Sequence, residues 1–274
     1  MRLGISQDAR PQATVLLTAA AISIILWFIP FAEILTFPFR IFVTFIHEGG
    51  HAIAALLTGN SVGSLSVATN ASGETFTSQG GTISQMLVAS AGYVGSMAYG
   101  ALLLVLIRRS VAARVVLIGS AGLVLALTLI YGLFVPLFSG AAWSGIPFTI
   151  LAGILITTGL VLVARFVRAR VATFFVGFLA VQCILNAILD LKTVFFLSSP
   201  FAPSVPTDAV AMANATGIPA FFWAVLWIGL ALGILWLAMR SYGAKNRRLQ
   251  PGLPFPEALP SSVQELPTAR VSSR

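Results

Sequence analysis

The chain has 274 residues, of which 58% are hydrophobic and only 9% are charged, and its formal net charge is +8. Soluble domains carry about 25% charged residues, so this composition excludes an ordinary soluble domain and indicates a polytopic membrane protein. The Lys and Arg residues lie between apolar runs, as loop anchors facing an anionic membrane surface do. We therefore expect a lipid bilayer as partner and no nucleic acid.

The apolar residues gather in runs of the length that a membrane-spanning helix needs, about 20 residues. These runs cover residues 13–29, 39–58, 84–107, 115–138, 146–164, 171–197 and 219–240. We predict an all-α polytopic membrane protein with six or seven transmembrane helices, because one early segment could be partial or re-entrant. The predicted organisation is a polar N-terminus over 1–12, a membrane-embedded domain over 13–240, and a basic, Pro-containing disordered tail over 241–274.

The second run contains the sequence His-Glu-Gly-Gly-His at residues 47–51, which includes both histidines of the chain. On a helix, positions i and i+4 lie on one face about one turn apart. Two imidazoles so placed can bind one zinc ion, and the glutamate between them can activate a zinc-bound water. We take His47 and His51 as metal ligands and Glu48 as catalytic. Histidines that only hydrogen-bond inside a helix bundle are the disfavoured alternative, since such groups are costly at membrane depth.

The segment after the motif helix changes character. Thr58-Gly59-Asn60 is typical of a helix end, and residues 60–83 are rich in Ser, Thr, Gly and Asn, with a turn signal from Asn70 to Gly73. We predict a short β-hairpin here. It could bind an extended substrate strand through main-chain hydrogen bonds, or it could be a plain extracytoplasmic connection.

Positive charges predict the orientation of the later helices. The segments 108–114 and 165–170 and the start of the tail carry three Lys or Arg each, whereas 139–147 and 198–218 carry none. Loops rich in Lys and Arg face the cytosol. We therefore place the C-terminus in the cytosol and the hairpin toward the opposite side.

Eight acidic residues supply the candidates for a third zinc ligand. Asp190 is favoured because it lies within an apolar run, four residues after Asn186 and on the same helical face. The alternative is that Asp190 pairs with Lys192 or reaches the membrane surface at the helix end. Asp208 is the second candidate, although it or Thr207 is expected to cap a short helix.

These residues resemble the site-2 protease superfamily of zinc metallopeptidases, and most closely its B-like branch of small bacterial membrane peptidases. The resemblance covers about residues 35–240 and is carried by the His47–His51 motif, the Gly-rich hairpin, Asn186 to Asp190, and the later Thr207-Asp208-Ala209. It implies zinc held by the two histidines and an aspartate from a later helix. The usual Asn-Pro-x-Pro-x-x-Asp-Gly setting of that aspartate is absent here, which leaves the third ligand open between Asp190 and Asp208.

The expected function is that of a zinc metalloendopeptidase embedded in the bacterial cell membrane, cutting in or near a transmembrane segment of a membrane protein substrate. Glu48 would activate the water, and Asn186 would orient the scissile carbonyl or stabilise the oxyanion. The alternatives are a catalytically inactive membrane scaffold or binding protein that keeps the metal site, and a small transporter.

Overall fold

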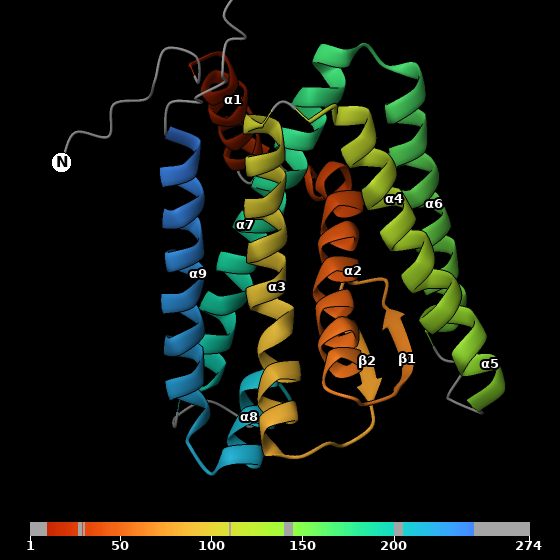
Figure 1. The fold of residues 1–274 in the computed structure, drawn as a ribbon, viewed down its shortest axis with the longest axis vertical. Helices are drawn as coiled ribbons and strands as arrows, with labels where there is room; N and C mark the ends of the chain where they lie inside the picture. Colours follow the sequence, from red (N-terminus) through yellow and green to blue (C-terminus); the bar gives the residue numbers. More distant parts are fainter. Residues whose placement is uncertain are drawn as a thin grey trace, which may run out of the picture. The chain divides into compact units, whose positions relative to one another are not determined.

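The computed structural model describes residues 10–26, 29, 31–109, 111–139, 145–199 and 205–243, which all fall within one compact unit spanning residues 1–244. Nearly all of the predicted polar N-terminus and, from residue 244 on, the predicted tail lie outside the described residues. The helices are α1 (Arg10–Leu26), α2 (Glu33–Leu57), α3 (Thr82–Arg108), α4 (Ala113–Leu129), α5 (Val135–Ser139), α6 (Ile146–Phe166), α7 (Ala169–Leu197), α8 (Asp208–Thr216) and α9 (Ala220–Gly243). The strands are β1 (Val62–Val67) and β2 (Gly73–Thr77), and a π-helical turn, η2 (Ile130–Phe134), joins α4 to α5 (Figure 1).

Five helices in the described part of the chain are long and apolar enough to cross a membrane. They are α3, the continuous helix Ala113–Phe138, α6, α7 and α9. The chain is therefore an integral membrane protein, but the predicted six or seven spans are not reached. The apolar part of α1 is shorter than a span, Leu16–Leu26. Helix α2 is continuous, but polar residues at Arg40 and in the motif interrupt its apolar sequence.

The outer faces of the helices suit contact with lipid. Large apolar side chains lie exposed there, including Leu151, Leu155 and Leu162 on α6 and Trp236 on α9. Hydrocarbon tails can surround such faces, and a helix satisfies its own backbone hydrogen bonds within them. The Glu48 and His51 side chains of the motif are instead buried inside the bundle.

Helix α3 is the centre of the bundle and packs against α2, α7 and α9. Small residues permit these close contacts, as is common between membrane helices. A Cβ atom built at Gly50 of α2 would lie 2.3 Å from the carbonyl oxygen of Ala91, and one at Gly100 would lie 3.0 Å from that of Ala180. The second glycine of the His-Glu-Gly-Gly-His motif thus lets the backbones of α2 and α3 approach each other.

The end of α2 and the hairpin confirm two predictions from the sequence. Gly59 has a φ of +80°, and the N–H groups of Gly59 and Asn60 donate to the carbonyls of Leu56 and Ala55, which is the pattern of a Schellman helix end. β1 and β2 then pair antiparallel. In the turn between them, the Asn70 side chain accepts hydrogen bonds from the N–H and the hydroxyl of Ser72.

The outer edge of β1 is covered by the neighbouring helices. The hydroxyl of Thr149 on α6 accepts a hydrogen bond from the N–H of Val67 at 2.8 Å. The turn η2 also packs on β1. A Cβ atom added to Gly132 of η2 would lie 3.7 Å from the carbonyl oxygen of Leu65. Both strands pack on α2, and covering the edge of β1 leaves β2 at the open edge of the hairpin.

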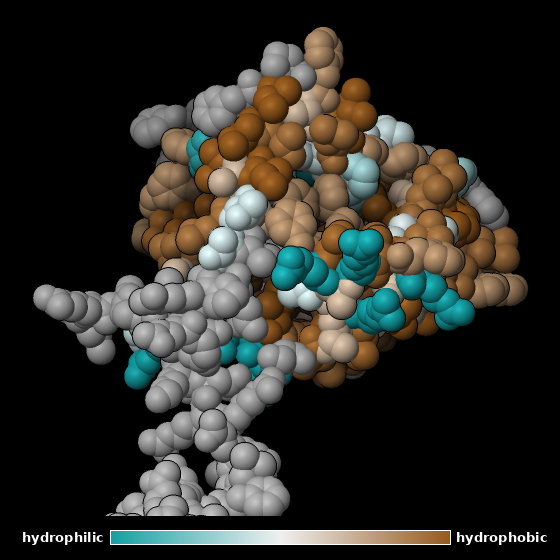
Figure 2. All heavy atoms as spheres, turned by 90° about the horizontal axis from the view of Figure 1, so that it is seen from above, coloured by the Kyte–Doolittle hydropathy of each residue, from teal (hydrophilic) through white to brown (hydrophobic). Residues whose placement is uncertain are grey.

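The two ends of the bundle differ in charge. The connections from α3 to α4 and from α6 to α7, with the end of α9, lie at the upper end in Figure 1, whereas the hairpin and α8 lie at the lower end. The upper connections contain the six arginines of segments 108–114 and 165–170. Figure 2 looks onto this end and shows hydrophilic residues gathered beside apolar helix flanks.

Candidate metal centre

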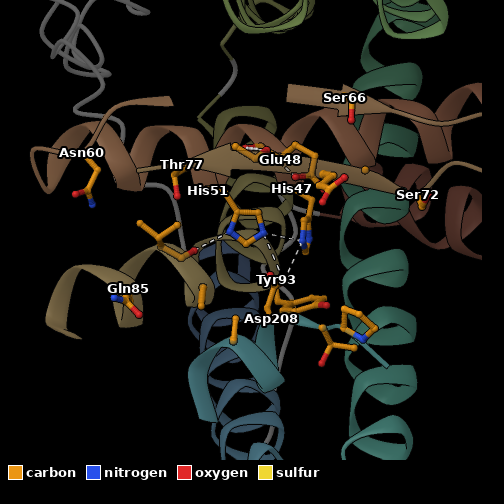
Figure 3. Close-up of a pocket in the computed structure, with 18 of the residues that line it drawn as sticks. His47, Glu48, His51, Asn60, Ser66, Ser72, Thr77, Gln85, Tyr93 and Asp208 are labelled. Atoms are coloured by element: carbon orange, nitrogen blue, oxygen red, sulfur yellow. Dashed lines mark hydrogen bonds and ion pairs between the residues drawn. The ribbon is translucent and has the colours of Figure 1, made fainter. Parts of the chain in front are cut away.

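Helix α2 brings the two histidines together because they are separated by one helical turn. The Nε2 atoms of His47 and His51 are 3.1 Å apart. The N-terminus of α8 adds a third group: Oδ2 of Asp208 is 3.5 Å from each Nε2 atom. Figure 3 shows the two imidazoles and the carboxylate converging from α2 and α8. Among the described residues, these three form a group able to hold a metal ion.

The distances within this group fit zinc. Zinc ligands lie about 2.0–2.1 Å from the metal in a tetrahedral arrangement, which places any two ligand atoms about 3.3–3.4 Å apart. The three separations observed here are 3.1, 3.5 and 3.5 Å. Three protein ligands also leave one position of a tetrahedron open, as in catalytic rather than structural zinc sites.

Further contacts prepare these groups for metal binding. Nδ1 of His51 lies 2.7 Å from the carbonyl oxygen of Val88 on α3. A carbonyl can only accept, so Nδ1 carries the proton and Nε2 is free to bind a metal. Burial raises the pKa of the Asp208 carboxyl, but without a metal ion the imidazoles of His47 and His51, when protonated, donate hydrogen bonds to it; these outweigh burial and hold the pKa below its ordinary value. Asp208 is therefore ionised at neutral pH, as a metal ligand must be.

Gly92 of α3 makes room for the two imidazoles. A Cβ atom at this position would lie 2.3 Å from Nε2 of His47 and 2.5 Å from Nε2 of His51. The ring of Tyr93, the next residue, packs in a T-shaped arrangement with His47, with ring centroids 4.6 Å apart. Trp227 of α9 lies behind Tyr93. α3 therefore forms the wall against which the metal-binding side chains are held.

Glu48 lies beside the metal group but on the side of the hairpin. Its side chain is buried, and the hydroxyl of Thr75 on β2 donates to its Oε2 atom at 2.7 Å. Gly73 of β2 also touches it, since a Cβ atom there would be 2.5 Å from Oε1. The hairpin thus positions the carboxylate between β2 and the two imidazoles.

Two cavities meet at this centre. A polar cleft of about 670 Å3 runs between the hairpin, the start of α3 and the start of α8. A second cavity of about 320 Å3 lies between α2, the hairpin turn and the last turns of α7. Both are lined by His47, Glu48, Gly73 and Tyr93. Within the metal group, His47 lines both cavities, whereas His51 and Asp208 line only the first.

Asp190 and Asn186, the two site residues expected on α7, lie in the second cavity with His47 and Glu48. Asp190 is not in the group that could hold a metal ion, whereas Asp208, the second candidate from the sequence, is part of it. The Nδ2 atom of Asn186 donates to the main-chain carbonyl of Gln182, one turn back on its own helix, at 2.8 Å. Both residues face the space that adjoins the metal group.

The cap of α8 explains why Asp208 is available. Thr207 is the N-cap, and its hydroxyl accepts a hydrogen bond from the N–H of Val210 at 3.3 Å. The sequence predicts a cap of a short helix at Thr207 or Asp208, and this prediction is confirmed at Thr207. Asp208 becomes the first residue of the helix, with its carboxylate directed to the histidines.

A comparison with protein families gives a match over most of the chain. The model of the Peptidase M50B-like family matches residues 15–238, which is most of the chain. The chain belongs to the Peptidase M50B-like family. Comparisons with curated proteins and with solved structures found no match. The resemblance to site-2 protease-like intramembrane metallopeptidases is thereby confirmed.

Membership of the M50B-like family implies a metallopeptidase, and the M50 peptidases depend on zinc. Within the described part of the chain, the His-His-Asp group is where such a metal could be held.

Sequence reasoning missed three residues that complete this M50B-like centre: Gly92, Tyr93 and Thr75. The first two follow Ala89-Ser90-Ala91, a run of small residues that could have indicated close packing on the motif helix. Thr75 carries no comparable signal, because the strand could present either face to α2 until the tertiary structure is known.

Proposed function

We propose that this M50B-like protein is a membrane-embedded zinc endopeptidase that hydrolyses a peptide bond in or near a transmembrane segment of another protein. The observation that supports this best is the spacing of three ligand atoms beside a buried glutamate, at the meeting point of two cavities. A binding scaffold needs neither the open coordination position nor the general base.

His47, His51 and Asp208 would hold the zinc. When bound, zinc supplies Lewis acidity, which polarises the scissile carbonyl and lowers the pKa of water toward about 7. Glu48 takes a proton from the attacking water and later delivers it to the leaving amine. The Thr75 hydroxyl keeps the Glu48 carboxylate in place through the transfer.

Tyr93 and Asn186 are the candidates for stabilising the oxyanion. Tyr93 packs on His47 and lines both cavities, so its hydroxyl is the better-placed donor. Asn186 already donates to Gln182, and it lines only the second cavity. With Asp190 it would contact substrate on that side, binding the main chain of an extended segment.

The hairpin would receive the substrate as an added strand. β1 is covered by α6, whereas β2 lines the cleft with Gly73, Thr75 and Thr77. An unwound peptide can pair with a strand through main-chain hydrogen bonds, which suits substrates of varied sequence. The partners are therefore a membrane protein substrate and the lipid bilayer, and we place the protein in a bacterial cell membrane with its C-terminus in the cytosol.

The test uses the purified full chain in lipid vesicles with a single-span protein substrate. We expect zinc near one equivalent, cleavage by the wild type, and loss of cleavage in Glu48→Gln with zinc retained. Cleavage by Glu48→Gln at the wild-type rate would refute the mechanism. If zinc binds and no Glu48-dependent product forms from any membrane substrate, the scaffold alternative is favoured.

A further inference from the structure

Another cavity lies apart from the metal centre, between α7 and α9, which pack side by side (Figure 1). Its volume is about 240 Å3. Its apolar lining consists of Ile188, Leu191 and Phe195 of α7 and Ile228, Ala231 and Leu232 of α9. Leu191 and Ala231 are buried and form its floor. Ile188 and Leu232 are exposed at its rim. The cavity is therefore a groove on the outer face of the bundle, where hydrocarbon chains of a bilayer can enter it.

Lys192 is the one polar residue among those that line this groove. The residue is exposed. Within the described part of the chain both ion pairs involve Asp208, and no hydrogen bond reaches the Lys192 side chain. An ionisable side chain within a membrane-spanning run is costly and is usually functional. The ammonium group of Lys192 has three donors, and the described residues leave them without an acceptor.

Asp190, two residues earlier, does not supply this acceptor. Two residues on a helix are about 200° apart. Asp190 lines the second cavity, on the side of the metal centre, whereas Lys192 lines the outer groove. The remaining acidic residues of the described part of the chain also lie elsewhere: Glu33 begins α2, and Glu48, Glu74 and Asp208 line the polar cleft. The pairing of Asp190 with Lys192, considered from the sequence, is therefore not found among the described residues.

The position of Lys192 along α7 brings it to the boundary of the hydrocarbon region. It comes 23 residues, or about 35 Å, after the start of α7 at Ala169 and five residues, or about 8 Å, before its end at Leu197. The hydrocarbon core of a bilayer is about 30 Å thick. With the arginine-flanked start of α7 at one membrane surface, Lys192 therefore reaches the other surface, where the phosphates of the lipids lie and toward which lysine side chains extend.

The apolar part of the groove lies deeper than Lys192. The end of α7 meets the start of α9, since the ring centroids of Phe195 and Phe221 are 4.9 Å apart. Counted from this common end, Ile188 is about 14 Å along α7 and Leu232 is about 18 Å along α9. Both lie about 6–10 Å further into the bilayer than Lys192. A molecule with an anionic head and an apolar chain directed toward the middle of the bilayer matches both parts of the groove.

We propose that this groove binds one anionic phospholipid, with its phosphate at Lys192 and an acyl chain along Leu191 and Ala231. Lysine binds phosphate as a point charge, and basic pockets between membrane helices bind anionic lipid headgroups. A zwitterionic lipid fits less well, because its own cation competes with Lys192 for the phosphate. The inference does not rest on the proposed peptidase function, since the groove shares no lining residue with the metal group.

The test measures lipid binding to the purified full chain in detergent by native mass spectrometry. Phosphatidylglycerol and phosphatidylcholine with identical acyl chains are titrated separately. We expect the wild type to bind one phosphatidylglycerol about tenfold more tightly than phosphatidylcholine, as a hydrogen bond to a charged group implies. Lys192→Gln should lose this preference. Lys192→Arg should keep it, because arginine also binds phosphate.

Two further variants act as controls. Arg170→Gln removes one exposed positive charge from the other end of the same helix and should keep the preference. Ala231→Leu fills the floor of the groove and should weaken phosphatidylglycerol binding about tenfold, with thermal unfolding in detergent to check the fold. Lys192→Gln changes an exposed side chain, so its result stands even if Ala231→Leu does not fold.

Three results would overturn the inference. If the wild type binds both lipids equally, or Lys192→Gln keeps the preference, the groove holds only the lipid that surrounds any membrane protein. Unchanged binding in a folded Ala231→Leu variant would place the acyl chain outside the groove. Glycerol phosphate, which has no acyl chain, should bind far more weakly than phosphatidylglycerol; equal binding would show a phosphate site without a lipid groove.

Discussion

The placement of the imidazoles against α3 can be tested at Gly92. In Gly92→Ala the new Cβ atom would lie 2.3 Å from Nε2 of His47 and 2.5 Å from Nε2 of His51, whereas ordinary contacts begin at 3.4 Å. The rings must therefore move by about 1 Å. Zinc sites tolerate deviations of only about 0.2 Å in ligand distances, so the geometry for metal binding should be lost.

The expected loss of zinc affinity is about 100-fold or more. Changes to groups that merely support zinc ligands cost 10–100-fold, and this change displaces two ligands directly. A 100-fold loss equals about 2.8 kcal/mol, at 1.4 kcal/mol for each factor of ten. The fold should survive, because alanine is favoured over glycine inside a helix by about 1 kcal/mol.

The assay is zinc titration of the purified variants, with thermal unfolding in detergent to check the fold. Gly95→Ala is the matched control on the same helix, since a Cβ atom there would be 3.7 Å from the Cα atom of Gly50, an ordinary contact. It should bind zinc as the wild type does. If Gly92→Ala binds zinc as tightly as Gly95→Ala, the histidines do not face α3 in the way described.

Further predictions concern the other groups at the centre. Asp208→Asn should lower zinc affinity by about 100-fold, whereas Asp190→Asn should leave zinc content unchanged; loss of metal in the second variant alone would restore Asp190 as ligand. Thr75→Val should lower kcat by about tenfold with zinc retained, and Thr75→Ser should restore it, because a hydrogen bond to charged Glu48 is worth about 1.5–3 kcal/mol. Tyr93→Phe should lower kcat by about 10–100-fold and change KM little; an unchanged kcat would exclude Tyr93 as oxyanion donor. Removal of zinc by a chelator should abolish cleavage, and zinc should restore it.

Local signals in the sequence were sufficient for the parts of the site that a short segment determines. The spacing of His47 and His51 needs only a helix to bring both imidazoles to one face. The end of this helix at Gly59 and the turn at Asn70 follow from the conformations that these residues favour. The apolar runs likewise predicted each of the five helices that qualify as spans.

The position of Asp208 beside the two histidines depends on long-range packing. The sequence favours Asp190 because an acidic side chain within an apolar, membrane-spanning run is energetically costly and is therefore usually functional. Its helix brings it to a neighbouring cavity, whereas Asp208 reaches the imidazoles because Thr207 caps α8 and the helix begins beside α3. Residue spacing carries no information on how two helices more than 150 residues apart approach each other.

The sequence by itself determined the membrane class, the two histidines with Glu48, and the hairpin, since each depends on composition or on contacts within a few residues. Only the tertiary structure decided that Asp208 joins the histidines, that Gly92 makes room for them, and that Thr75 binds the glutamate. The physical reason is that the metal group is assembled from α2 and α8 against α3 and β2.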